Sequence, residues 1–372
     1  MGLGEKKALV TKYVFLGLST ARALAIARVT RHQYYYKQRN GKRGRKPSTT
    51  TPFIQGDDVT MVDNQVVIDR IKKLKSDPDL NSGYKSSTQF LRTKGFIINK
   101  KKIRRLMREE LLLETKSKKQ TKTYAKYRKV MPKGPLEVLE MDIKMVWVER
   151  ERKHALVLNI IDTFTRKWLY RSEGFSVTKQ SVKRAWEHII INHLQPNDCL
   201  RKDVHIEIRN DNDPRFTAKM VQDFFRENHM NQVFTHPYTP QENGHVESFH
   251  AILNKRVKRR QYWTIDELAE DLDVFMDKYN NVRQHTSIAY LSPNDFDQLW
   301  NMNLIDLKVD EDKKQMNFKL KIPRHKVNEL TGNDEPEGSS LARFEPLDGA
   351  KNRKNEKEKC RHKIPALHRL TV

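Results

Sequence analysis

Three acidic residues lie at positions where a carboxylate could do chemistry. Asp142 lies between Met141 and Ile143 inside an apolar segment, where a carboxylate is costly to bury unless it is paired or binds a metal ion. Asp211 follows a short alternating segment, and Glu247 lies near the start of a helical pattern, with 35 residues between the two. Each alone is more often a salt-bridge partner or a solvent-facing group. Together they form an ordered set of strand Asp, loop Asp and helix Glu.

The segment from Leu136 to about Trp300 contains the elements that must position these carboxylates. Three predicted strands come first, and helices and strands then alternate, which is typical of an α/β fold with a mixed sheet flanked by helices. The loop that holds Asp211 follows a strand, where open α/β sheets place their active sites. Strands are predicted over 136–148, 155–162, 167–175, 204–208 and 232–236, and helices over 179–193, 218–228, 243–260 and 265–279.

Two helical units precede this segment. Residues 1–36 predict three short helices, over 6–15, 20–27 and 30–37, in a helix-turn-helix-like layout. A plain small helical bundle is an equal alternative for them. Residues 58–115 predict a second helix-turn-helix with a basic last helix, in which Lys101, Arg104 and Arg105 are candidate DNA contacts.

Basic runs connect these units. Residues 37–57 and 116–132 are expected to be linkers, because they hold few side chains that a core would bury. Arg43 and Arg45 in the first linker are candidate DNA contacts that would enter a narrow minor groove, although such a run is more often a solvated tether. Residues 301–372 are charged and irregular, and we expect a C-terminal extension that is partly disordered.

The composition favours a polyanionic partner. Lys and Arg number 72 against 47 Asp and Glu, a net charge of +25, and basic residues that neutralise phosphates release counterions. Only Cys199 and Cys360 are present, which excludes a disulfide scaffold and a cysteine-based zinc site. No apolar run approaches the roughly 18 residues of a membrane span, and no signal-peptide cleavage pattern is found. We therefore expect a cytoplasmic protein associated with DNA and not with a membrane.

The carboxylate set and its surroundings resemble the Asp, Asp, 35-residue gap, Glu signature of integrase-core transposases and retroviral integrases. The chain is most similar to insertion-sequence transposases encoded as the second of two frame-shifted reading frames. Upstream, Gly83-Tyr84 and Asn99–Arg108 are similar to that family's second helix-turn-helix, so the resemblance covers about 58–300. The core motifs that carry it are Asn159-Ile-Ile-Asp-Thr-Phe-Thr-Arg166, Asp211-Asn212, Asn243-Gly244 with Glu247-Ser248-Phe249, and Gln284-His285-Thr286-Ser287 through Leu291-Ser292-Pro293.

The resemblance implies an RNase H-like catalytic core over residues 133–300. It also implies that Asp142, Asp211 and Glu247 hold two Mg²⁺ ions, which Mn²⁺ could replace. Hard cations prefer carboxylate oxygens, and two ions roughly 3.5–4 Å apart clamp an in-line phosphoryl displacement. In this arrangement Asp142 bridges both ions, and Asp211 and Glu247 each complete one.

The chain departs from the family pattern at two places. Asp213 stands where relatives usually have Gly, and it is a rival ligand that would shorten the gap to Glu247 to 33 residues, so Asp211 is preferred. Asn254 stands where many relatives carry a Lys that contacts DNA, and Lys255 follows it. Both are candidate DNA contacts, and His236 and His250 are further ones.

These features predict a DNA transposase that binds the ends of its mobile element, cleaves strands and joins a 3′ end to another strand. The resemblance implies a homo-oligomer on DNA, because two ends must be held together. One alternative is a catalytically silent DNA-binding protein derived from a transposase. Another is a nuclease of the same fold that cleaves without joining.

Overall fold

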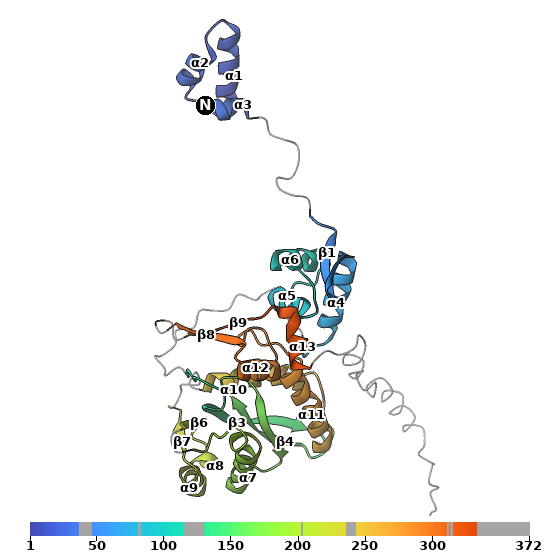
Figure 1. The fold of residues 1–372 in the computed structure, drawn as a ribbon, viewed down its shortest axis with the longest axis vertical. Coiled ribbons are helices and arrows are strands. Elements are labelled where there is room, and N and C mark those ends of the chain that lie inside the picture. The colour runs from blue at the N-terminus through green and yellow to red at the C-terminus, as the bar shows by residue number, and fades with distance from the viewer. Residues whose placement is uncertain are drawn as a thin grey trace, which may run out of the picture. The chain divides into compact units, whose positions relative to one another are not determined.

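The computed structural model divides the chain into two compact units, Met1–Ser48 and Thr49–Val372 (Figure 1). It describes residues 1–36, 47–80, 83–114, 130–201, 204–235, 243–310, 312 and 315–332. Arg43, Arg45, most of the second predicted linker, His236 and residues 333–372 lie outside the described residues. Within the described ranges, no helix has both the length and the apolar character needed to cross a bilayer.

The first unit contains the three predicted helices. They are α1 (Leu3–Phe15), α2 (Thr20–Ala27) and α3 (Arg31–Tyr35). A small core of Val10, Ala23, Leu24 and Val29 holds them together. Gly17 separates the first two helices at φ +96°, a conformation that a residue without a Cβ adopts at little cost.

The second unit begins with a β-hairpin that continues into three helices. Strands β1 (Thr50–Gln55) and β2 (Asp58–Asp63) pair antiparallel across a two-residue turn with Gly56 at φ +63°. The prediction of a linker up to residue 57 is therefore wrong for 50–55. The helices are α4 (Asn64–Ser76), α5 (Tyr84–Thr93) and α6 (Lys100–Glu109). Their apolar faces share a core that includes Ile71, Leu91 and Ile103.

A five-stranded sheet forms the centre of the second unit. Its order is β5-β4-β3-β6-β7. The first three strands along the chain pair antiparallel, and β6 and β7 continue the sheet in parallel with β3. This mixed sheet is the predicted RNase H-like sheet. Its strands are β3 (Val138–Val148), β4 (Lys153–Asp162), β5 (Trp168–Gly174), β6 (Ile206–Asn210) and β7 (Met230–Phe234).

Helices cover both faces of this sheet, as Figure 1 shows. Because strand side chains alternate between faces, Leu158 and Ile160 of β4 pack under one helix layer, and Val157 and Ile161 under the other. The first layer is α7 (Lys179–Ile189) with the π-helical turn Ile190–Leu194, α8 (Pro214–Thr217) and α9 (Lys219–Glu227). The second layer is α10 (Gly244–Val257) and α11 (Ile265–Asn281).

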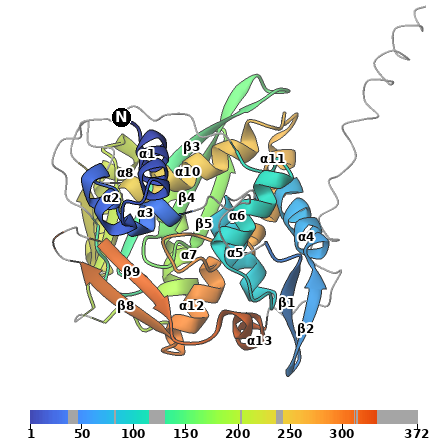
Figure 2. The same cartoon turned by 90° about the horizontal axis from the view of Figure 1, so that it is seen from above.

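The chain beyond residue 300 continues the fold, contrary to the prediction of an irregular extension. Helix α12 (Pro293–Asn301) leads into the hairpin β8 (Ile305–Asp310) and β9 (Gln315–Leu320), visible in Figure 2, and then into α13 (Val327–Thr331). Ile305 and Val327 are buried with Phe164, Phe296 and Leu299. The domain boundary at 300 therefore falls inside one hydrophobic cluster, and a core that ended there would expose these side chains.

Candidate active site

Asp142 lies near the middle of β3, on the face that α10 covers. Its Oδ1 accepts a hydrogen bond from the Ile143 backbone N–H at 2.7 Å. Burial raises the pKa of Asp142 to about 6, the Ile143 bond opposes this rise, and the charges of Asp211 and Glu247 add to it. The structure therefore brings Asp211 and Glu247 within electrostatic reach of Asp142.

The register of the sheet explains why Asp211 belongs to this cluster. Strand β6 runs parallel to β3, with Leu139 opposite Ile208 and Glu140 opposite Arg209. Two residues beyond the Glu140–Arg209 pair, the same register brings Asp142 opposite Asp211. Burial raises the pKa of the Asp211 carboxyl, and the neighbouring Asp213 charge raises it further.

Glu247 reaches the same place from the first turn of α10. Val246, the residue before it, is fully buried against the sheet, and this sets the rotation of the helix about its axis. Glu247 then lies about 100° further round the helix, on a less enclosed side, and burial raises the pKa of its carboxyl.

Asp213, the rival ligand, already has partners. Its Oδ1 accepts hydrogen bonds from the Arg215 backbone N–H at 2.9 Å and from Arg215 Nε at 2.7 Å. The Arg215 side chain lowers the pKa of the Asp213 carboxyl. A carboxylate that caps a helix and pairs with its own neighbour is less free to bind a cation, which supports Asp211 as the ligand.

The donor set of the cluster suits hard divalent cations. In the described part of the chain, no three His, Cys, Asp or Glu side chains lie close enough together to hold a metal ion as they stand. However, Asp142 is partly desolvated beside two like charges, and a cation would relieve that repulsion. Carboxylate oxygens are also the ligands that Mg²⁺ and Mn²⁺ accept. These residues therefore fit such ions.

His250 belongs to the core of the site and not to a DNA-binding surface. It is 9% exposed, its Nε2 lies 3.2 Å from Asn159 Nδ2, and its Nδ1 lies 3.4 Å from Asp142 Oδ2. Burial lowers the pKa of His250 to about 4, and the Lys144 charge adds to this. The imidazole is thus neutral at pH 7. The candidate DNA contact at His250 is therefore wrong, since its ring faces Asn159 and Asp142.

The other described candidate DNA contacts lie on the helices α6 and α10. Lys101 and Arg104 are exposed on α6, and Arg104 lies over the Tyr84 ring at 5.6 Å. Arg105 forms an ion pair with Glu109 at 3.1 Å. On α10, Lys255 is exposed and Asn254 is half-buried.

Sequence reasoning missed Glu140, which lies two residues before Asp142 on β3. It is fully buried, and its Oε2 accepts a hydrogen bond from the Val246 backbone N–H at 2.7 Å. Burial raises the pKa of Glu140 to about 7, while the backbone of Val246 and the charges of Arg166 and Arg209 oppose the rise. The sequence does carry a signal for Glu140: it is an acidic residue in an apolar strand, two residues before Asp142 and therefore on the same face.

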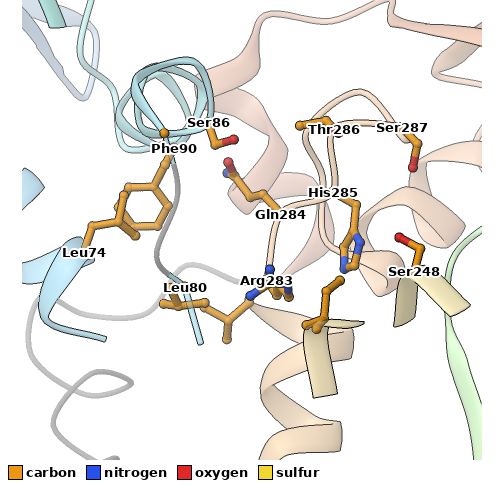
Figure 3. Close-up of a pocket in the computed structure, with 13 residues that line it drawn as sticks. Leu74, Leu80, Ser86, Phe90, Ser248, Arg283, Gln284, His285, Thr286 and Ser287 are labelled. Atoms are coloured by element: carbon orange, nitrogen blue, oxygen red, sulfur yellow. The ribbon is translucent and has the colours of Figure 1, made fainter. Parts of the chain in front are cut away.

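A cleft of about 330 Å³ opens beside the site (Figure 3). Ser248, next to Glu247 in sequence, and His285 point toward each other across it, and Gln284 points toward Ser86. Burial lowers the pKa of His285 to about 3, and the charges of Arg283 and Arg166 lower it too. The lining residues are Leu74, Leu80, Gly83, Ser86, Phe90, Ser248, Ile252, Val282, Arg283, Gln284, His285, Thr286 and Ser287.

The buried, neutral His285 should make the fold sensitive to acid. Because its pKa is near its ordinary value in the unfolded chain and depressed in the folded one, the unfolded state binds the extra proton below pH 6.5. We expect the free energy of unfolding of the wild type to fall by roughly 1.5 kcal/mol more than that of His285→Gln between pH 6.5 and 5. Urea unfolding at both pH values measures this, and equal losses would contradict a neutral His285.

A family model, an insertion-element protein and solved catalytic domains are similar to this chain. A family model described as integrase core domain matches residues 228–293. An uncharacterized 31.7 kDa protein of the insertion element IS407 from Burkholderia multivorans is 22% identical over 236 residues, which span 63% of this chain and 81% of that protein. Among solved structures, the catalytic core domain of HTLV-2 integrase in complex with magnesium covers 41% of this chain and 91% of its own, with a TM-score of 0.29 and 18% identity. The catalytic domain of the Mos1 mariner transposase covers 38% of this chain and 70% of its own, with a TM-score of 0.33 and 14% identity.

Proposed function

We propose that this chain, which belongs to the integrase-core transposases of insertion-sequence type, is a DNA transposase that binds the ends of its mobile element, cleaves strands and joins a 3′ end to another strand. The observation that carries this proposal is the cluster of Asp142, Asp211 and Glu247. The three come from a strand, from the loop after a parallel strand and from a helix, and two of them raise the pKa of the third. The fold builds such a cluster only at the cost of repulsion among like charges.

The carboxylates act by holding two Mg²⁺ ions, or Mn²⁺ in their place. When bound, the ions supply Lewis-acid activation of the attacking hydroxyl and stabilisation of the leaving oxygen. Asp142 presents its carboxylate from the rigid strand between the other two. Neutral His250 lies against that carboxylate, and Asn159 holds the other nitrogen of the ring. These two side chains orient Asp142 without adding a positive charge that would compete with a cation.

The DNA contacts come from the candidate basic residues. Lys101, Arg104 and Arg105 on α6 face a DNA end, and Arg43 and Arg45 enter a narrow minor groove. Asn254 and Lys255 lie two helical turns beyond Glu247 on α10, so a strand held by them passes close to the carboxylates. The protein acts on DNA as a homo-oligomer, because strand joining requires two ends in one complex.

The proposal is tested with a DNA fragment that carries the flanks of the gene. The fragment is incubated with Mg²⁺ and with either the wild type or Glu247→Gln. We expect nicks at inverted-repeat boundaries and joined products with the wild type alone, while both proteins bind the ends equally. Tight binding without cleavage by the wild type would favour a silent DNA-binding protein. Nicks without joined products would favour a nuclease.

A further inference from the structure

The helix that carries Glu247 begins without a cap of its own. In the described chain, the side chain of the N-cap residue Asn243 makes no capping hydrogen bond. The first N–H groups of a helix have no partner within the helix, so a buried helix start needs an acceptor from elsewhere. For α10 that acceptor is Glu140 of β3, whose Oε2 accepts a hydrogen bond from the Val246 backbone N–H at 2.7 Å.

This contact joins the two elements that hold Asp142 and Glu247. Glu140 and Asp142 lie on the same face of β3, because side chains two residues apart on a strand do. Val246 is the residue directly before Glu247. The Glu140 carboxylate therefore links the strand that carries Asp142 to the backbone of the helix that carries Glu247. Only a few covalent bonds separate this hydrogen bond from either carboxylate.

A second contact between the same elements lies one turn further along α10. His250, four residues after Val246, faces Asp142 at 3.4 Å and Asn159 at 3.2 Å. The His250 contact is longer and meets a flexible side chain, whereas the Glu140 contact meets the helix backbone itself. Of the two, the Glu140 contact fixes where the helix begins.

The surroundings of Glu140 leave little freedom for another arrangement. Its side chain is fully buried, and the charges of Arg166 and Arg209 act on it. Arg166 also contacts His245, the other residue of the helix start. The hydrogen bond from the Val246 backbone N–H to this enclosed side chain therefore holds the first turn of α10 against β3.

We propose that Glu140 is a positioning residue that sets the separation between Asp142 and Glu247 by holding the first turn of α10 against β3. This inference rests on the proposed function, since it assigns Glu140 a task in the same metal-binding site. A misplacement of about 1 Å in a catalytic constellation lowers the rate by about a hundredfold. Outer contacts that orient metal ligands change metal affinity by about 10- to 100-fold.

The test compares three replacements of Glu140 in the full-length protein. Glu140→Leu removes the acceptor, Glu140→Gln keeps an acceptor oxygen without the charge, and Glu140→Asp keeps the charge on a side chain one methylene shorter. Ser292→Ala is the matched control, because buried Ser292 caps α12 through the Asp295 N–H at 3.2 Å, and α12 carries none of the three carboxylates. The readouts are Mn²⁺ affinity by electron paramagnetic resonance without DNA, nicking kcat and KM, and the thermal midpoint.

We expect Glu140→Leu to weaken Mn²⁺ binding by at least about tenfold and to lower the nicking kcat by about a hundredfold, with KM for DNA changed less than about twofold. Glu140→Gln should stay within about fivefold of the wild type in both, since its amide oxygen can accept the Val246 N–H. Ser292→Ala should lower the thermal midpoint without changing Mn²⁺ affinity. If Glu140→Leu does not fold, Glu140→Asp gives the result, with weaker Mn²⁺ binding at an unchanged thermal midpoint.

Two outcomes would overturn the inference. Wild-type Mn²⁺ affinity in Glu140→Leu, or in Glu140→Asp where the leucine variant does not fold, would show that the site does not depend on this contact. Equal defects in Glu140→Gln and Glu140→Leu would show that the charge, and not the hydrogen bond to α10, matters. A wild-type protein that binds no Mn²⁺ and nicks no DNA contradicts the proposed function itself, whatever the variants do.

Discussion

Asp142→Asn is expected to lower the rate of Mg²⁺-dependent nicking by at least about a thousandfold. Asp142 is the most enclosed of the three carboxylates, and the charges of both others act on it, so under the proposed function it would contribute most to holding a metal ion. An asparagine keeps the shape but loses the negative charge, and a metal ion contributes several kcal/mol of transition-state stabilisation. Each 1.4 kcal/mol is a factor of ten in rate. Gel-based nicking of a DNA end under single-turnover conditions measures the loss.

Asp213→Asn is the matched control for this substitution. Asp213 is an aspartate of the same segment as Asp211, but it already caps α8 and pairs with Arg215. Its replacement should lower the thermal midpoint slightly and leave nicking within about threefold of the wild type. The opposite pattern, an active Asp142→Asn beside an inactive Asp213→Asn, would mean that the carboxylates have been assigned wrongly.

The elements of the catalytic core could be predicted because each has one dominant signal. Ala155–Asp162 is a continuous apolar run, and the structure covers it on both faces. The helix after Thr178 has apolar residues at helical spacing, and Val182, Ala185 and Trp186 are indeed buried. Such patterns follow from burial alone, so local sequence is enough to find them.

Contacts between segments far apart in the sequence could not be predicted in the same way. The strand at Thr50–Gln55 depends on pairing with Asp58–Asp63, and its Gly56-Asp57 turn was the only local sign. Residues 305–320 alternate weakly, and their burial depends on Phe164, which is more than 130 residues away. From the sequence, Glu140 is only a charged residue in a strand. Its contact with the start of α10 can be seen only in the folded chain.

A buried network of charges joins the second helical unit to the catalytic core, and the sequence gives no local sign of it. Arg256 on α10 is 5% exposed. It donates two hydrogen bonds to the carboxylate of Asp271 on α11, at 2.9 and 2.7 Å, and one to Asp79, which follows α4. Lys278 of α11 also pairs with Asp79, at 3.4 Å, and with Asp77. The helix that carries Glu247 is therefore tied to the segment proposed to recognise DNA.

We expect Arg256→Met to lower the free energy of unfolding by about 3–5 kcal/mol, because it leaves Asp79 and Asp271 buried without their main counter-charge. Arg260→Met is the control. Arg260 contacts the same Asp271, but its side chain is 47% exposed, so water screens the pair and the loss should stay below about 1 kcal/mol. Urea unfolding of the two variants compares them directly. Similar losses would mean that the buried network does not hold the two parts together. A loss confined to Arg256→Met would mean that the buried ion pairs of Arg256, and not the exposed pair of Arg260, stabilise the contact between α10, α11 and the segment after α4.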